Sequence, residues 1–191
     1  ASGYLVRFGS TQAKAKDIQR ITTTTCKLTG LEPDSAYYIA VYPIKKVTKD
    51  FYASQNFVDN AKIVTTASAV TGVKMTHWDV KNNVVMLQWD NTAKYETGYQ
   101  IELYKSDGTT KLKTYNIRGR KAAMKVFSLK KVKNTPFQYR VRTFTSFGGQ
   151  KSYGDWSEFA YAVPQADVSA KKVSDKEITL SWKPVEGAGS Y

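Results

Sequence analysis

Two stretches of the sequence repeat one strand pattern 93 residues apart, and this repeat restricts the fold more than any other feature. "NNVVMLQWDN" at residues 82–91 matches "DKEITLSWKP" at residues 175–184. In both, every second residue is apolar and the series ends on tryptophan, as Val85, Leu87, Trp89 and as Ile178, Leu180, Trp182. A period of two predicts a strand with one buried face. A chain that repeats such strands at a fixed distance predicts a tandem β architecture.

Two further matches extend the repeat. "CKLTGLEPDSAYYIAVYP" at residues 26–43 matches "FSLKKVKNTPFQYRVRTF" at residues 127–144, and both read as an apolar residue, a turn and a strand that begins near tyrosine. "GYLVRF" at residues 3–8 matches "GYQIELY" at residues 98–104, and the last two residues, Ser190 and Tyr191, begin the same motif again. The chain therefore holds two repeat lengths in phase.

These patterns resemble the fibronectin type III repeat. The most specific marks are the tryptophan of the second strand and a Leu-x-x-Leu-x-Pro-x-x-x-Tyr series, present as Leu28, Leu31, Pro33 and Tyr37. The resemblance implies an all-β, immunoglobulin-like fold in which each repeat of about 100 residues is a two-sheet antiparallel sandwich. The middle copy departs from the series at Val132 and Asn134 and has one extra residue before Tyr139, so we expect its tyrosine corner to be shifted.

The resemblance divides the chain into one complete and two partial repeats. We expect residues 1–67 to supply strands C to G of the first repeat, residues 68–164 to form the complete one, and residues 165–191 to supply strands A, B and the start of C. In the complete repeat the expected strands are A at 70–75, B at 84–89, C at 99–104, C′ at 111–117, E at 125–129, F at 138–144 and G at 155–161. The predicted core is Val85, Leu87, Trp89, Tyr99, Ile101, Leu103, Phe127, Leu129, Tyr139 and Val141, and Cys26 is predicted to be core in the first repeat.

Two interpretations of the partial repeats stay open. In the first, the sequence is a piece of a longer array, and its partners are other domains of the parent chain. In the second, the partial repeats of different molecules pair head to tail, and such a heterologous contact gives rings or open filaments.

The sequence contains no pattern typical of a catalytic, metal or cofactor site. His77 is the one histidine and has no motif around it, Cys26 is the one cysteine, and Glu96 and Glu102 are not expected to share a cleft. We therefore expect no catalytic residue, no metal site and no cofactor. No apolar run approaches the ~20 residues needed to span a bilayer, so no membrane insertion is expected.

Positive charge is concentrated in the middle of the sequence. The net charge is +13, and residues 67–165 contribute +9 through sixteen basic and seven acidic side chains. Residues 118–133 hold seven of these basic side chains and no acid: Arg118, Arg120, Lys121, Lys125, Lys130, Lys131 and Lys133. Such a surface attracts anionic polymers, namely cell-wall polymer, sulfated glycan or nucleic acid. The alternative is a lysine-rich surface that keeps the protein soluble.

Aromatic residues give two more hypotheses. "DWSEF" at residues 155–159 resembles one half of the Trp-Ser motif of the cytokine receptors, which implies that Trp156 stacks on Arg140 and Arg142 of the neighbouring strand as a structural ladder. We expect Glu102 to neutralise the same face. Trp78, Phe147 and Tyr153 are expected in turns or loops, where exposed rings can hold sugars. Three scattered rings do not define a site, so weak glycan binding stays an open alternative.

The function that best fits these features is a non-catalytic module of a bacterial protein that is secreted or held at the cell surface. It would act as a spacer, an adhesion surface or an accessory domain of a carbohydrate-active protein. The alternative is a binding module for an anionic polymer through residues 118–133.

Overall fold

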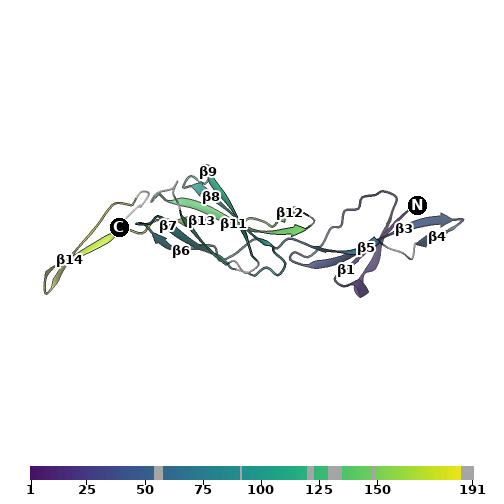
Figure 1. The fold of residues 1–191 in the computed structure, drawn as a ribbon, viewed down its shortest axis with the longest axis horizontal. Helices are drawn as coiled ribbons and strands as arrows, with labels where there is room; N and C mark the ends of the chain where they lie inside the picture. The colour runs from purple at the N-terminus through teal and green to yellow at the C-terminus, as the bar shows by residue number, and fades with distance from the viewer. Residues whose placement is uncertain (54–57, 91, 120–122, 129–134, 148, 186–191) are drawn as a thin grey trace. The chain divides into compact units, whose positions relative to one another are not determined.

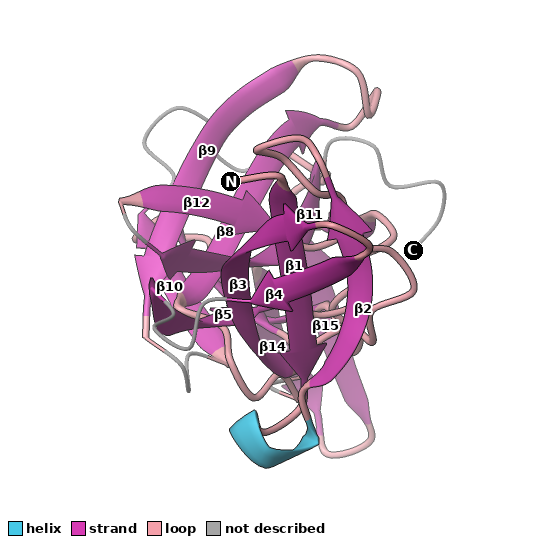
Figure 2. Cartoon of the chain, turned by 90° about the vertical axis from the view of Figure 1, so that its right-hand side faces the viewer, coloured by secondary structure: helices cyan, strands magenta, loops and turns pink. Residues whose placement is uncertain are grey.

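The fold is built from short antiparallel strands. The computed structural model describes residues 1–53, 58–90, 92–119, 123–128, 135–147 and 149–185. One 3-10 turn, η1 (Gln12–Lys14), interrupts the strands and is the cyan segment of Figure 2. The strands are β1 (Gly3–Gly9), β2 (Lys16–Ile21), β3 (Ala36–Val47), β4 (Asp50–Ala53), β5 (Val58–Val64), β6 (Lys74–Asp79), β7 (Val84–Gln88), β8 (Gly98–Lys105), β9 (Lys111–Arg118), β10 (Met124–Ser128), β11 (Phe137–Phe147), β12 (Gln150–Tyr153), β13 (Ala160–Ala162), β14 (Val168–Ser174) and β15 (Glu177–Trp182).

The chain divides into two compact units. Unit 1 comprises Ala1–Ser68, Ala93–Glu96 and Phe144–Tyr153, and unit 2 comprises Ala69–Thr92, Thr97–Thr143 and Gly154–Tyr191. The predicted division into repeats at 1–67, 68–164 and 165–191 remains a prediction, because contacts within a unit do not define repeat boundaries.

Unit 2 contains a two-layer sandwich. One sheet has the strand order β10-β7-β6, and the part of the other sheet that lies in unit 2 has the order β11-β8-β9 with β13 also paired to β11. Figure 1 shows β6 and β7 on one side of this sandwich and β8 and β9 on the other. Strands A, B and E thus face strands C′, C, F and G. The predicted all-β antiparallel sandwich is confirmed.

The core of unit 2 lies between these sheets. The predicted core residues Val85, Leu87, Trp89, Tyr99, Ile101, Leu103, Tyr139 and Val141 are all at most 1% exposed. The tryptophan and tyrosine rings of Trp89 and Tyr99 pack with centroids 5.3 Å apart. The two other residues of the predicted core, Leu129 and the side chain of Phe127, lie outside the described part of the chain.

The first strand of this sandwich corrects two expectations. It begins at Lys74 and not near residue 70, and Trp78 lies in it with 2% exposure, so the expected exposed position of Trp78 in a turn is wrong. The cause is a bulge between Met75 and His77, which places Trp78 opposite the buried Val85. The indole therefore packs against Phe137, with ring centroids 5.5 Å apart.

The described residues of the segment 1–68 in unit 1 form one sheet. Its order is β2-β1-β3-β4, with β5 also paired to β3. The pairing of β1 with β3 brings Phe8 opposite Ile39 and Val6 opposite Val41. The Tyr37 hydroxyl accepts a hydrogen bond from the backbone N–H of Glu32 at 2.9 Å, which is the tyrosine corner of this repeat. The shifted corner expected before Tyr139 would involve residues 129–134, which lie outside the described residues.

Candidate functional site

The outer face of the β9-β8-β11 sheet carries a row of polar and aromatic side chains. On β11, Tyr139 and Val141 point into the core with 0% exposure, so Arg140 and Arg142 between them point outward. On β8 the same alternation brings Gln100 to the outer face, together with Glu102 and Tyr104. We call this row the arginine ladder, and its members are Gln100, Glu102, Tyr104, Lys111, Asn116, Arg140, Arg142, Trp156 and Phe159.

Glu102 is the anionic centre of the arginine ladder. Its Oε2 accepts hydrogen bonds from Arg140 Nη2 at 2.8 Å and Nε at 3.2 Å, and also from the Tyr104 hydroxyl at 2.7 Å. Its Oε1 lies 2.7 Å from Lys111 Nζ. The Glu102 side chain is only 8% exposed, so both carboxylate oxygens depend on these partners.

The pKa values of this group follow from the same contacts. Burial alone would raise the pKa of Glu102, but hydrogen bonds from Lys111, Tyr104 and Arg140 outweigh burial and bring the pKa to about 2. The hydrogen bond to Glu102 raises the pKa of Lys111. Burial, followed by the bond to Glu102, raises the pKa of the Tyr104 hydroxyl. The charged state of Glu102 is therefore held well into the acidic range.

Trp156 packs against the guanidinium groups of both arginines in the arginine ladder. Its ring centroid lies 4.4 Å from Cζ of Arg140 and 4.1 Å from Cζ of Arg142, within the ~6 Å of a cation–π contact. Arg142 also donates to Gln100 Oε1 through Nε at 3.0 Å and Nη2 at 2.7 Å. Phe159 adds a second ring 5.3 Å from the Arg140 guanidinium. The structure thus brings the three predicted ladder residues together.

Ser157 explains how the sequence places Trp156. The Ser157 N–H donates to the Val141 carbonyl at 2.9 Å, and its Oγ accepts from the Val141 N–H at 3.0 Å. Residues 154–159 therefore follow β11 without forming a regular strand, and the expected strand at 155–161 is wrong for this part, because regular pairing resumes only at Ala160. The Ser157 hydroxyl thus accepts the hydrogen bond of the Val141 N–H in place of the backbone carbonyl that would accept it in a regular sheet.

Sequence reasoning missed several members of the arginine ladder. From the sequence, no role was assigned to Gln100, Tyr104, Lys111, Asn116 or Phe159. A signal existed for two of them, because Gln100 and Tyr104 lie two residues before and after Glu102 and must share its face of the strand. Phe159 had no such signal, since the irregular course of residues 154–159 sets its direction.

The basic stretch is only partly described. Arg118 and Lys125 are exposed, as a polyanion site requires. The other five predicted residues, Arg120, Lys121, Lys130, Lys131 and Lys133, lie outside the described residues. Whether the seven side chains form one surface remains a prediction.

The aromatic residues considered for weak glycan binding lie in different settings. Trp78 is core, as described above, and Tyr153 lies in β12 with 36% exposure. Phe147 lies in β11, which forms a hairpin with β12 through the pairing of Phe147 with Gln150. The expected loop position of Phe147 and Tyr153 is therefore wrong, because β11 and β12 extend the sheet into this segment. Trp78 is excluded from glycan binding by its burial.

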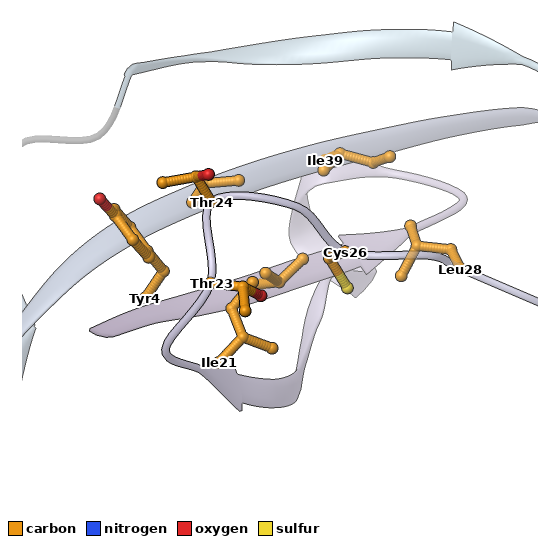
Figure 3. A pocket seen from close by; sticks show the side chains of 9 residues that line it. Tyr4, Ile21, Thr23, Thr24, Cys26, Leu28 and Ile39 are labelled. Atoms are coloured by element: carbon orange, nitrogen blue, oxygen red, sulfur yellow. The ribbon is translucent and has the colours of Figure 1, made fainter. Parts of the chain in front are cut away.

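Unit 1 has an open apolar cleft of about 310 Å³ on one face of its sheet. Figure 3 shows Tyr4, Ile21, Cys26 and Ile39 around this cleft. The full lining consists of Tyr4, Val6, Ile21, Thr23, Thr24, Cys26, Leu28, Ile39 and Val41. Cys26 is exposed and residues 25–29 form no strand, so its predicted position in a core strand is wrong. The Cys26 side chain faces the cleft as expected, and it is exposed there.

Two other kinds of feature are absent from the part of the chain that the structure describes. Within the described residues, no group of three or more histidine, cysteine, aspartate or glutamate side chains is arranged to hold a metal ion. Within the same residues, no helix has the length and apolar character to cross a bilayer.

Comparison with known proteins gives similarity at the level of structure. No protein-family model matches the sequence, and no curated protein matches it. The chain is similar to the two fibronectin type III domain segment of chicken tenascin, with 15% identity, a TM-score of 0.46, and coverage of 84% of this chain and 83% of that one. It is also similar to the chicken CNTN1 FN1–FN3 domains, with 18% identity, a TM-score of 0.44, and coverage of 85% of this chain and 54% of that one. The chain thus spans about half of that structure. A third similar structure is the chicken interferon gamma receptor alpha chain, at 10% identity, a TM-score of 0.42 and 85% coverage of both chains.

Proposed function

We propose that this protein is a non-catalytic module, secreted or held at the cell surface, that acts as a spacer or adhesion surface of a larger protein. As an accessory domain of a carbohydrate-active protein, the module would have the same spacer or adhesion role next to a catalytic domain. One observation carries the proposal: the charged groups on the outer face of the β9-β8-β11 sheet bind one another. Both oxygens of Glu102 are occupied, and Trp156 lies against two guanidinium groups.

This arrangement supports a mechanical role more than a chemical one. A site for acid–base chemistry needs a group whose pKa lies near the working pH, whereas the ion pairs hold Glu102 at a pKa of about 2. Each cation–π contact stabilises by roughly 0.5–1 kcal/mol at an exposed site. The arginine ladder ties β8, β9, β11 and residues 154–159 together, and a spacer needs such resistance to opening.

The proposal is tested by pulling the chain from its two ends in a single-molecule force experiment. A spacer is expected to give a discrete unfolding event for unit 2, and Trp156→Ala is expected to lower the force of that event. Tyr161→Ala serves as the control, because Tyr161 is an aromatic residue on the neighbouring strand with 64% exposure. Equal forces for the wild type and Trp156→Ala would contradict a mechanical role for the arginine ladder.

A second candidate function is binding of an anionic polymer through residues 118–133. The exposed Arg118 and Lys125 and the +9 charge of residues 67–165 support it. Binding to heparin, wall polymer or DNA is expected to weaken steeply with salt, because each neutralised charge releases a counterion. A variant with Lys130, Lys131 and Lys133 changed to Glu should lose most retention on heparin, whereas the same change at Lys171, Lys172 and Lys176 should lose little. If the wild type is not retained on heparin, wall polymer or DNA even at low salt, polymer binding is rejected and only the first proposed function remains.

A further inference from the structure

The hairpin β14–β15 copies the hairpin β6–β7 in sequence but differs from it in burial. Val85, Leu87 and Trp89 are 0%, 0% and 1% exposed, whereas Ile178, Leu180 and Trp182, 93 residues later, are 66%, 55% and 43% exposed. Pairing in the hairpin places Val168 opposite Trp182 and Ala170 opposite Leu180. Residues directly opposite share a face of the sheet. This face of β14–β15 is exposed and is apolar at Val168, Ala170, Leu180 and Trp182, whereas Lys172 lies opposite Ile178 at its turn end.

Unit 2 shows what such a hairpin packs against. There β7 pairs along its other edge with β10, in a register that sets Phe127 opposite Val85 and Ser128 opposite Val84. The apolar face of β6–β7 packs on the inner face of β8 and β11, in one cluster with Ile101 and Val141.

Unit 1 contains the matching receptor surface. Its β1 repeats the sequence of β8, so Tyr4 and Val6 stand where Tyr99 and Ile101 stand in unit 2. In unit 1 these side chains line the open cleft together with Ile39 and Val41. Cys26 stands at the sequence position of Phe127, and residues 25–29 form no strand. The cleft thus presents the apolar side chains that a hairpin like β6–β7 covers. Beside them lies a segment with which the second strand of such a hairpin can pair.

We propose that the β14–β15 hairpin of a second copy of this chain covers the cleft of unit 1 and pairs through β15 with residues 23–27. The β7–β10 register, transferred by the repeat, places Cys26 opposite Ile178, Thr24 opposite Leu180 and Lys27 opposite Glu177. Thr24, Cys26, Ile178 and Leu180 then face the cleft. Lys27 and Glu177 form a charge pair on the outer face, where both are exposed at present.

The hairpin offers an apolar surface for such a contact. Its apolar side chains Val168, Ile178, Leu180 and Trp182 are 54%, 66%, 55% and 43% exposed. In unit 2 the equivalent face buries Val85, Leu87 and Trp89 to at most 1% exposure, which shows how fully this kind of hairpin can be covered. Donor hairpin and receptor cleft lie on different parts of the chain, so the contact is heterologous and adds copies head to tail. This inference goes beyond the proposed function and does not depend on it.

The single native cysteine gives a direct test on the full chain. Opposed residues of antiparallel strands have Cα atoms about 4.5–5.5 Å apart, within the ~4.4–6.8 Å range of a disulfide. Ile178→Cys is therefore expected to form an intermolecular disulfide with Cys26 under mild oxidation, seen as dimers and longer species on a non-reducing gel. The matched control Thr179→Cys alternates to the other face and should cross-link far less, and Cys26→Ser in the Ile178→Cys background should remove the products.

A second experiment changes only the charged pair and leaves the apolar face of the hairpin unchanged. Lys27→Glu and Glu177→Lys should each weaken association of the otherwise native chain by about two- to five-fold in sedimentation equilibrium, as expected for a cross-strand charge pair. The double variant should restore it. The proposal is overturned if the native chain stays monomeric at all concentrations. It is also overturned if the Ile178→Cys variant forms only an intramolecular disulfide with Cys26, or if Thr179→Cys cross-links equally well.

Discussion

The central strands β1 of unit 1 and β8 of unit 2 share a sequence pattern but differ in burial. Seven of the eight residues of β8 are buried, whereas only Gly3 and Val6 are buried among the seven of β1. The β6–β7–β10 sheet covers the inner face of β8, and the arginine ladder covers its outer face. The outer face of β1 has looser contacts, such as Arg7 over the Tyr42 ring at 5.1 Å. Alternation thus specifies a strand and its faces, while the covering elements decide burial.

The largest expected difference between the two strands comes from a charge in the core. Leu103→Asp in β8 should unfold unit 2, at a cost of more than about 4 kcal/mol, because Leu103 is 1% exposed. The equivalent Phe8→Asp in β1 should cost less, since Phe8 is only half-buried. Hydrogen exchange measured separately on peptides of each unit checks this. Equal loss of protection in both units would contradict the assigned strand register.

The next effect concerns the ion pair. Arg140→Ala should destabilise unit 2 by about 2–3 kcal/mol, because it leaves the buried Glu102 carboxylate with fewer partners. Arg7→Ala in unit 1 should cost only about 0.5–1 kcal/mol, as for an exposed cation–π contact. Urea unfolding followed by tryptophan fluorescence reports the first change, since unit 2 holds all four tryptophans. Comparable costs for both variants would mean that the arginine ladder adds nothing special to β8.

Trp156→Ala should have a smaller effect, about 1–2 kcal/mol, because it removes two cation–π contacts. Phe51→Ala is the counterpart in unit 1, where the ring lies 4.7 Å from the Arg20 guanidinium and is 40% exposed. It should cost less than about 1 kcal/mol. Thermal melting of both variants measures the difference, and a larger loss for Phe51→Ala would reverse the comparison.

The smallest expected effect is a dependence of stability on pH. The folded-state pKa of Glu102, about 2, lies below its ordinary value of 4.5, so its contribution is complete above pH ~4.5 and is lost as the pH falls toward 2. The contribution is about 1 kcal/mol after screening by water around Lys111 and Arg140. Glu102→Gln should flatten the stability of unit 2 between pH 4.5 and 2. Asp107 also has a pKa of about 2, so Asp107→Asn is the control that separates the two slopes.

Strand alternation predicted the sandwich of unit 2 well. The strands around Leu87, Ile101 and Val141 lie where the pattern placed them, because in each every second residue is apolar and these residues share the buried face. The prediction was less accurate where irregular backbone interrupts regular pairing. The Ser157 hydroxyl replaces regular pairing before β13. Gly72, with φ of +63°, belongs to an irregular stretch before β6 in which the Thr71 carbonyl accepts from the Asp90 N–H.

The candidate sites were predicted to different extents. The contact of Trp156 with Arg140 and Arg142 followed from a local motif and a two-residue spacing, both of which are visible in sequence. Cys26 was misplaced because its match to Phe127 predicts the direction of its side chain but not whether a second sheet covers it. That depends on residues far along the chain or on another molecule, which local pattern does not contain.

The serine-held course of residues 154–159 has a consequence for solubility. An uninterrupted edge strand offers a row of N–H and C=O groups to which a neighbouring molecule can add a strand, and this is a common start of aggregation. Here the strand beside β11 is divided into β12, of four residues, and β13, of three, with Trp156 and Ser157 between them. The segment that builds the arginine ladder thus also shortens the sheet edge available to a misfolded neighbour, and Ser157→Ala is the change that would most directly expose it.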